Sequence, residues 1–439
     1  MVFHSPVWRT SGPWPIQQLS NIREKLVHIS SSRAARGLVP LFHKIHTPYY
    51  YDFIEVCYNT PFSRFERKER SCMNIVCDKS LLSAAIDGVS RAVTLRSSIP
   101  ALEGILLKAD GFQLTLTGYD LEMAITTTIE ANVREPGEIV LSAKLLGDMV
   151  RRLPVGEVTI TTGDGGNATI KGGVAEFDIL AMSAADYPDL PNPGADRTLC
   201  LKAGTLRDMI EKTLYAVSQD DKKPAHTGEL FAIEEDKLTV VALDGYRLAI
   251  VERPITAQKH IRIIIPAKTL TEVNKLLGED DQDVYISANR RFVVFEAGSY
   301  VILSRLIEGE FLNYSNVIPS GFKTRVVLET RDFIDTIERA SLIITERLKN
   351  PLRILFDKKV TVRCQTNLGK VVDEFDADIE GEAVEIGFNN RYLLDALRNA
   401  RCDKVAMEMT GALSPVKILP ADDSNDFIYL VLPVRFKND

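Results

Sequence analysis

The stretch RTLCLKAGTLRDMIEKTL, residues 197–214, decides the fold, because its pattern of a short strand followed by an amphipathic helix returns along the chain. Close counterparts are MNIVCDKSLLSAAIDGV at 73–89 and TRVVLETRDFIDTIERA at 324–340, so the unit returns about every 125 residues. A second copy follows each of them: GEIVLSAKLLGDMVRRLP at 137–154, IRIIIPAKTLTEVNKLLG at 261–278 and VEIGFNNRYLLDALRNA at 384–400. Six copies of one unit predict a protein that works through its shape, since repeats stack into extended or closed surfaces.

Each predicted helix carries one apolar stripe on a polar background. In residues 78–91 the stripe is Leu81, Leu82, Ala85, Ile86 and Val89, and the other five helical stretches repeat this spacing. Between the helices lie alternating stretches at 113–129, 157–182 and 238–255, which are interrupted by glycine-containing turns. The pattern predicts an α+β protein in which helices cover one side of antiparallel sheets.

The repeat predicts three domains, at 73–196, 197–321 and 322–439. Residues 1–72 differ from them: they hold both tryptophans and carry a net charge of +5, against −12 for residues 73–439. One interpretation is a basic arm that targets the protein or contacts nucleic acid. The other, which we favour, is that Met73 is the true start, because the repeat begins within two residues of it.

Charge is divided unevenly between the predicted elements. The six helical stretches sum to +5, so the strands and loops of residues 73–439 carry −17. The division could arise by chance. Alternatively, the helices line a surface that faces a polyanion, since Lys and Arg attract phosphates without regard to sequence.

The sequence offers little support for an enzyme. Cys57, Cys72, Cys77, Cys200, Cys364 and Cys402 form no C-x-x-C pair, which predicts reduced thiols rather than a metal site. The glycine-rich stretch 163–173 lacks the order of a phosphate loop and is interpreted as a hairpin. We find no stretch of ~18 apolar residues and expect no membrane span. No cofactor or metal is predicted, and a hydrolase or transferase on a repeat scaffold stays as an unsupported alternative.

Five strings make a specific resemblance possible: LTLTGYDLEM at 114–123, MSAADYPDLP at 182–191, VALDGYRLA at 241–249, VEIGFNNRYLLDAL at 384–397 and YLVLPVRF at 429–436. In this order, and with three internal repeats, residues 73–436 resemble the bacterial DNA polymerase III beta subunit, the sliding-clamp family. The resemblance implies the DNA clamp fold, in which two three-domain chains join head to tail as a ring with helices inside and sheets outside.

The resemblance also implies a function in DNA replication without chemistry of its own. A clamp in the cytoplasm encircles double-stranded DNA and acts as a processivity factor by raising the effective concentration of a tethered polymerase. The implied partners are the polymerase III alpha subunit, the clamp loader, repair and translesion polymerases, and other proteins with a clamp-binding motif. A clamp-like paralogue that serves repair polymerases only, and a protein scaffold that never touches DNA, stay open as alternatives.

Site residues follow from the resemblance position by position. Residues that match DNA-facing positions are Arg96, Lys144 and Lys223. The pocket that binds partner peptides would comprise Leu243, Gly245, Tyr246, Arg247, Leu248, Val317, Ser414, Pro415, Val416, Leu430, Leu432, Pro433, Val434 and Arg435. The dimer interface would use Phe177, Leu342 and Ile343. The chain departs from the family at Leu243, Tyr246, Leu312 and Asn316, and His226 stands where leucine is usual.

Overall fold

The computed structural model divides the chain into two compact units, Met1–Glu69 and Arg70–Asp439. The described residues all belong to the second unit: 73–163, 166–192, 194, 197–234, 236–256, 260–344, 351–422, 424 and 426–436. Both interpretations of residues 1–72 therefore lie outside the described residues.

All six predicted helices are present, and each follows directly on a strand. The pairs are β1 (Asn74–Asp78) with α3 (Lys79–Val89), β6 (Gly137–Ser142) with α4 (Ala143–Arg152), β10 (Arg197–Lys202) with α5 (Ala203–Thr213), β14 (Ile261–Pro266) with α6 (Ala267–Leu276), β18 (Thr324–Glu329) with α7 (Thr330–Ser341), and β23 (Val384–Phe388) with α8 (Asn390–Ala400). Local chemistry fixes two of the helix starts, where the side chains of Asp78 and Asn389 accept hydrogen bonds from backbone N–H groups of the first turn.

The other strands form hairpins that repeat with the helices. They are β2 (Gly104–Asp110), β3 (Gln113–Tyr119), β4 (Met123–Glu130), β5 (Asn132–Glu135), β7 (Glu157–Thr162), β8 (Asn167–Gly172), β9 (Ala175–Leu180), β11 (Gly228–Glu234), β12 (Lys237–Leu243), β13 (Arg247–Pro254), β15 (Asp283–Ala288), β16 (Phe292–Ala297), β17 (Tyr300–Arg305), β19 (Leu352–Phe356), β20 (Val360–Thr366), β21 (Gly369–Phe375), β22 (Asp378–Gly381), β24 (Lys404–Met409), β25 (Val416–Pro420) and β26 (Ile428–Val431). The described ladders are antiparallel, for example β3 with β4 and β12 with β13. The predicted α+β class is confirmed.

The strands assemble into four sheets, and two of these cross from one repeat to the next. The orders are β5-β1-β7-β8-β9, β10-β15-β16-β17-β4-β3-β2-β6, β14-β11-β12-β13-β26-β25-β24-β18-β22 and β21-β20-β19-β23. In the eight-stranded sheet β17 pairs with β4, and we call this pairing the first joint. In the nine-stranded sheet β13 pairs with β26, and we call this pairing the second joint.

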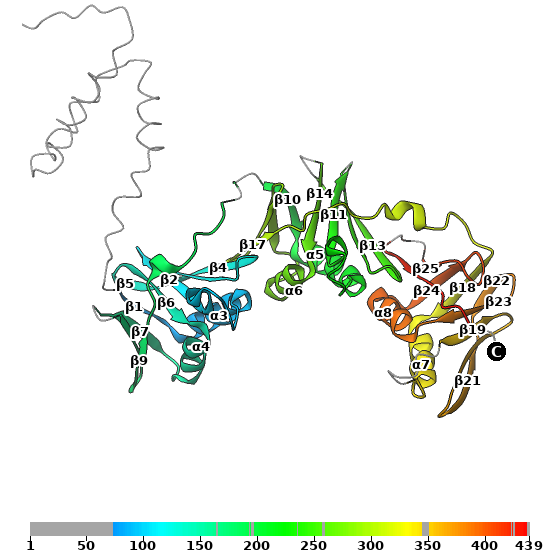
Figure 1. The fold of residues 1–439 in the computed structure, drawn as a ribbon, viewed down its shortest axis with the longest axis horizontal. Coiled ribbons are helices and arrows are strands. Elements are labelled where there is room, and N and C mark those ends of the chain that lie inside the picture. The colour runs from blue at the N-terminus through cyan, green and yellow to red at the C-terminus, as the bar shows by residue number, and fades with distance from the viewer. Residues whose placement is uncertain are drawn as a thin grey trace, which may run out of the picture. The chain divides into compact units, whose positions relative to one another are not determined.

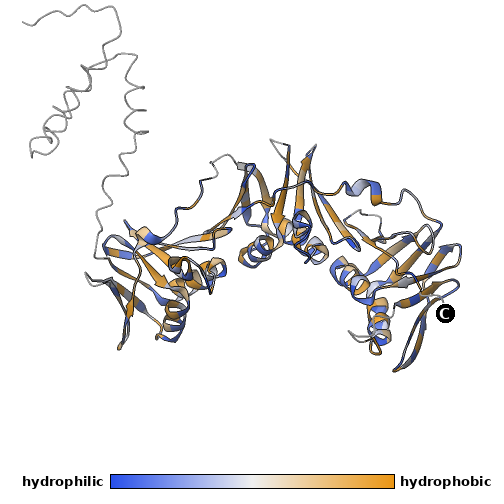
Figure 2. Ribbon diagram, viewed as in Figure 1, coloured by the Kyte–Doolittle hydropathy of each residue, from blue (hydrophilic) through white to orange (hydrophobic). Residues whose placement is uncertain are grey.

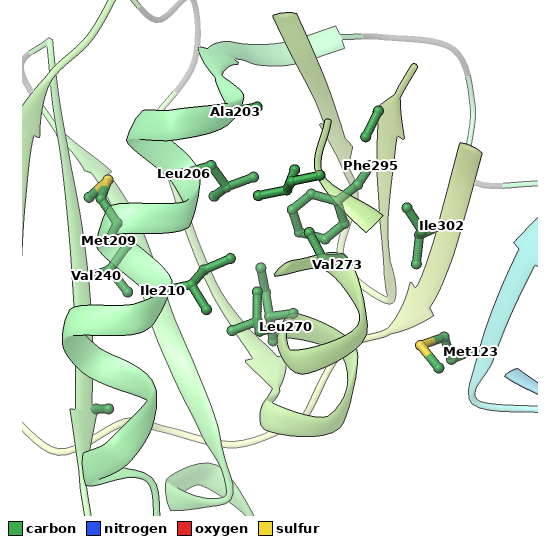
Figure 3. Close-up of a cluster of buried hydrophobic side chains, with 14 of the residues drawn as sticks. Met123, Ala203, Leu206, Met209, Ile210, Val240, Leu270, Val273, Phe295 and Ile302 are labelled. Atoms are coloured by element: carbon green, nitrogen blue, oxygen red, sulfur yellow. The ribbon is translucent and has the colours of Figure 1, made fainter. Parts of the chain in front are cut away.

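The apolar stripes of the helices pack on these sheets. Figure 1 shows the six helices on the same side of the connected sheets, and Figure 2 shows orange, hydrophobic segments on the strands and on the helix faces turned toward them. In the central repeat the buried side chains of Leu206 and Ile210 on α5 meet those of Leu270 and Val273 on α6 (Figure 3). The stripe therefore decides which face of each helix is buried and leaves the opposite, charged face to solvent.

Candidate DNA interface and partner pocket

The three predicted DNA-binding side chains share one property: each is exposed and forms no ion pair with the described residues. Lys144 lies in the first turn of α4, and Arg96 lies in the loop after the short 3-10 helix Ser90–Ala92. Lys223 precedes the 3-10 turn Pro224–His226. Their charges are therefore available to an external anion.

Many other cations on the helices are neutralised by neighbouring carboxylates. Arg91 binds Glu272 of α6 at 3.2 Å, Arg398 of α8 binds Glu338 of α7 at 2.7 Å, and Lys268 binds Asp120. Pairs between two helices leave the positive balance of the helices unchanged, whereas Lys268 is neutralised by a carboxylate outside them. The attraction that remains for a polyanion rests on unpaired side chains such as Lys144.

Arg96 also lines an open depression of about 930 Å³ beside the first joint. Its lining is mostly polar and consists of Arg91, Val93, Thr94, Leu95, Arg96, Ser97, Ser98, Asp120, Glu122 and Lys268. Side chains from the first repeat and from α6 therefore meet at this surface.

At the second joint the structure brings three predicted pocket residues together. Leu243, Leu248 and Leu430 are buried in one apolar cluster, which Phe311 joins from a distant loop. Leu248 and Leu430 are direct partners across the pairing of β13 with β26. Val416, in contrast, is buried in the main core, where it pairs with Val431 of β26.

Four other predicted pocket residues are partly exposed, and we call them the rim. Tyr246, Val317, Leu432 and Val434 leave about 36–59% of their surface exposed. The remaining predicted members are Gly245, with a positive φ of 92°, half-buried Ser414, Pro415 and Pro433, and exposed Arg435.

The C-terminal segment is fixed beside this rim by two backbone hydrogen bonds. The N–H of Leu432 donates to Tyr246 O at 2.9 Å, and the N–H of Val434 donates to Gly387 O at 2.8 Å. The rim therefore combines both repeats that meet at the second joint.

Arg247 ties this region together. Its Nε donates to Asp244 at 3.0 Å, and its guanidinium binds Asp395 of α8. The guanidinium carbon also lies 4.8 Å from the ring centre of Tyr392 and 5.5 Å from that of Tyr215. Because its side chain is only 12% exposed, Arg247 acts mainly as a link across the joint.

Two further residues, which the sequence analysis did not count among the pocket residues, lie beside the pocket. Tyr392 stacks on Tyr246 with ring centres 5.7 Å apart. His226 packs edge-on against Phe311 at 5.9 Å. Burial, and then the nearby Lys223 charge, lower the pKa of His226, while Asp244 opposes this shift. The departure of residue 226 from the usual leucine was the available signal for His226, whereas nothing local in the sequence indicated that Tyr246 and Tyr392 stack.

Of the predicted dimer residues, Phe177 lies on a sheet edge, whereas Leu342 and Ile343 follow α7. Phe177 is half-buried on β9, which is the edge strand of the five-stranded sheet. Leu342, which caps the end of α7, is 81% exposed, and the adjacent Ile343 packs against the core. β21 is an edge of the four-stranded sheet, so β9 and β21 each have a side without a partner strand in the described chain.

Comparison with known proteins connects this geometry to one family. Residues 73–191, 200–313 and 315–435 match the N-terminal, central and C-terminal domain models of the DNA polymerase III beta subunit. The chain is 33% identical over 380 residues to the beta sliding clamp of Halalkalibacterium halodurans and 30% over 377 to that of Bacillus subtilis, covering 83% of this chain and all of each relative. The chain belongs to the DNA polymerase III beta subunit family.

Solved structures of this family agree with the fold. A crystal structure of a putative DNA polymerase III beta subunit from Eubacterium rectale has a TM-score of 0.80 and 34% identity, and it covers 83% of this chain and 100% of its own. The sliding clamp of Bacillus subtilis has a TM-score of 0.81 at 30% identity, and it covers 84% and 100%. As a DNA polymerase III beta subunit, the chain is a replicative sliding clamp and not an enzyme.

The described residues were also compared with the features of membrane and metal-binding proteins. None of the described helices is long and apolar enough to cross a membrane. Within the same residues, no group of three or more His, Cys, Asp or Glu side chains is arranged to hold a metal ion.

Proposed function

We propose that two copies of this DNA polymerase III beta subunit close head to tail around duplex DNA and tether the polymerase to it. The proposal rests on a strand pairing that the chain makes twice, and on two unpaired sheet edges that could make a third pairing of the same kind. At both joints the last strand of one hairpin pairs with the last strand of another: β17 with β4, and β26 with β13. The strands of the same kind that remain are β9 and β21, and both are sheet edges.

The first joint predicts the register of the third. Ile302 pairs with Phe295 of its own hairpin as Phe177 pairs with Ile170, and Ile302 faces Ile125 across the first joint. Ile125 is the second residue after the turn that Asp120 and Met123 close. Val371 is the second residue after the turn that Thr366 and Gly369 close, so it is the equivalent of Ile125. Phe177 would therefore face Val371 of the second copy.

The same register brings together groups that are complementary. Asp178 would face Lys370, which is a favourable pair across two antiparallel strands. The counterpart of the hydrogen bond from Arg305 N to Glu122 O would join Leu180 to Leu368. Leu180 and Leu368 are 83% and 65% exposed, and such large apolar surfaces at sheet edges are usually covered by a partner. This complementarity supports a second copy as the partner of both edges.

DNA would pass along the helices without being read. Arg96, Lys144 and Lys223 are the proposed contacts, and unpaired basic side chains attract phosphates in a manner that weakens with salt. Partner proteins, namely the polymerase III alpha subunit, the clamp loader and repair or translesion polymerases, would insert a short peptide at the second joint.

We further infer that the domains span 73–196, 197–321 and 322–439, outside of which residues 1–72 lie, and that the protein works in the cytoplasm. The predicted peptide pocket would then lie where the second and third domains meet. These assignments rest on the internal repeat and on family membership.

Retention on circular DNA tests the ring. The full chain is loaded onto nicked circular DNA with an active clamp loader and ATP, washed in high salt, and the circle is then cut. We expect the protein to stay on the circle and to leave after cutting. Loss during the salt wash would contradict encirclement and favour the scaffold alternative, while binding to repair polymerases only would favour the paralogue.

Sedimentation tests the interface itself. The double substitution of Leu342→Ala with Ile343→Ala should convert dimers into monomers. Phe112→Ala is the control, because Phe112 is also exposed and apolar but lies between β2 and β3, away from the predicted interface. This variant should stay dimeric. A double variant that still sediments as a dimer would show that the interface is elsewhere.

A further inference from the structure

The apolar clusters at the two joints are built from equivalent positions. The segment Pro100-Ala101-Leu102-Glu103-Gly104 leads into β2, and Pro224-Ala225-His226-Thr227-Gly228 leads into β11. Each segment begins a 3-10 turn with proline in its first positions. Leu102 is 1% exposed in the cluster of the first joint. The equivalent position of the second joint is His226, so one chain allows leucine and histidine to be compared.

His226 occupies this position at the second joint. Its ring packs against Phe311, and its neighbour Ala225 packs on the same cluster as Leu243, Leu248 and Leu430. The backbone holds it firmly, because His226 O accepts from Ser218 N at 2.9 Å and His226 N donates to Lys223 O at 2.9 Å. The backbone of His226 is therefore held in place, and its half-buried ring lies against Phe311 beside the proposed pocket.

One ring nitrogen of His226 is unsatisfied. Nδ1 is buried and has no hydrogen-bond partner among the described residues. A buried polar atom without a partner lowers stability, because it has lost its hydrogen bonds to water. A leucine, as in the first joint, would avoid this cost.

Asp244, the carboxylate whose charge acts on the His226 ring, does not supply the missing hydrogen bond. One oxygen of Asp244 accepts from the N–H groups of Tyr246 at 2.8 Å and Arg247 at 3.0 Å, and the other accepts from Arg247 Nε. Because burial and Lys223 lower the pKa of His226, the ring is neutral near pH 7. A neutral imidazole accepts at one nitrogen and donates at the other.

We propose that His226 is a specificity-determining residue of the peptide pocket, where it forms a hydrogen bond with an uncharged polar side chain, such as an amide, of the bound partner. This inference rests on the proposed partner-binding function of the second joint. An amide both donates and accepts, so it satisfies either tautomer of the ring. A carboxylate would meet a neutral ring beside the negative Asp244.

The test uses an extended nonapeptide with apolar anchors in which each position in turn is leucine or its isostere asparagine. Titration calorimetry compares the full chain with His226→Leu and with the control His260→Leu, at a histidine outside this region. At the position that meets residue 226 we expect the natural chain to favour asparagine about 2–10-fold, the worth of one hydrogen bond. His226→Leu should reverse this preference, and His260→Leu should keep it.

Two results would overturn the inference, and they are distinguishable. If peptides bind but His226→Leu keeps the natural asparagine-to-leucine ratio at every position, His226 does not contact the partner, while the pocket stands. If neither the library nor a segment of the polymerase binds the second joint, the proposed pocket fails and the inference with it. Nitrogen-15 shifts of the His226 ring provide a second readout, because Nδ1 should move on binding the asparagine peptide.

Discussion

The two joints have the same kind of strand pairing, but different side-chain interactions stabilise them. At the first joint the contact is steric: Tyr300 of β17 lies against α3 at Gly88, where an added Cβ would meet the ring at 2.5 Å. The Tyr300 hydroxyl donates to Ala84 O at 3.3 Å. At the second joint Lys212, the tenth residue of α5 as Gly88 is of α3, instead binds Asp208 at 2.8 Å and Asp426.

The clusters beside the joints differ in the same sense. Tyr187 fills the first cluster, and its hydroxyl donates to Thr117 O at 3.2 Å. The second cluster has Phe311 in the corresponding loop and Leu243 where the first has Tyr119. The first joint is thus closed by large rings with satisfied hydroxyls. The second instead has an unsatisfied histidine, and this difference supports the proposal that a partner binds there.

The largest expected effect comes from removing the charges at the second joint. Asp208→Asn with Asp426→Asn removes the two carboxylates that bind Lys212, whose side chain is 8% exposed, and that also bind Arg253. Breaking a buried pair in this manner costs about 3–5 kcal/mol. Urea unfolding should show this loss, whereas Glu338→Gln, at the exposed pair with Arg398, should cost under about 1 kcal/mol. Equal losses in the two variants would mean that Lys212 is not held by charge.

A steric change at the first joint should be the next largest. Gly88→Ala forces the Tyr300 ring to move and should cost about 1–3 kcal/mol, as overpacking does. Gly147→Ala is the matched control on α4, where the nearest atom is the flexible end of Arg151 at 3.3 Å and alanine favours the helix. In a thermal unfolding series, adding Tyr300→Ala should remove the cost of Gly88→Ala. Simple additivity of the two substitutions would argue against this contact.

The helices and hairpins could be predicted from sequence because the 3.6- and 2-residue periods record which faces are buried. The joints could not, since β17 and β4 meet through backbone groups about 175 residues apart and any edge strand offers such groups. Likewise, Lys144 was found by resemblance, but only the structure shows that Lys144 is unpaired while Lys268 is paired. His226, in contrast, was within reach of the sequence, because setting PALEG beside PAHTG exposes it.

Glu229 should make the stability of the central repeat depend on pH, unlike the equivalent positions of the other two repeats. It is fully buried, with Thr213 Oγ1 2.9 Å from one oxygen, while the equivalent residues in the other repeats are Ile105 and Leu352. Each of the three pairs with the residue just before a helix N-cap, namely Ile265, Leu141 and Phe388. Burial raises the pKa of Glu229 well above its ordinary 4.5. The central repeat is therefore the one with a titratable core at this position.

The sign of the pH effect follows from linkage. Because the folded pKa is the higher one, the stability from the protonated form is complete below about pH 4.5 and is lost as pH rises through the folded pKa, at up to ~1.4 kcal/mol per unit. Glu229→Gln cannot ionise, so melting temperatures of the variant and the natural chain should diverge with rising pH in favour of the variant. Parallel pH profiles would mean that Glu229 is charged in the folded state.

The smallest effects should come from the ion pairs at the rims of the joints, and these should not distinguish the two. Lys268 binds Asp120 across the first joint and Arg401 binds Glu211 across the second, and the cations are 60% and 49% exposed. Lys268→Ala and Arg401→Ala should each lower the free energy of unfolding by about 0.2–1 kcal/mol, and ~1 M salt should abolish the loss because it screens exposed charges. Urea titrations at low and high salt measure both values. A cost of several kcal/mol at high salt for Arg401→Ala, but not for Lys268→Ala, would contradict this expectation. It would mean that surface ion pairs stabilise the second joint in addition to the buried pairs of Lys212.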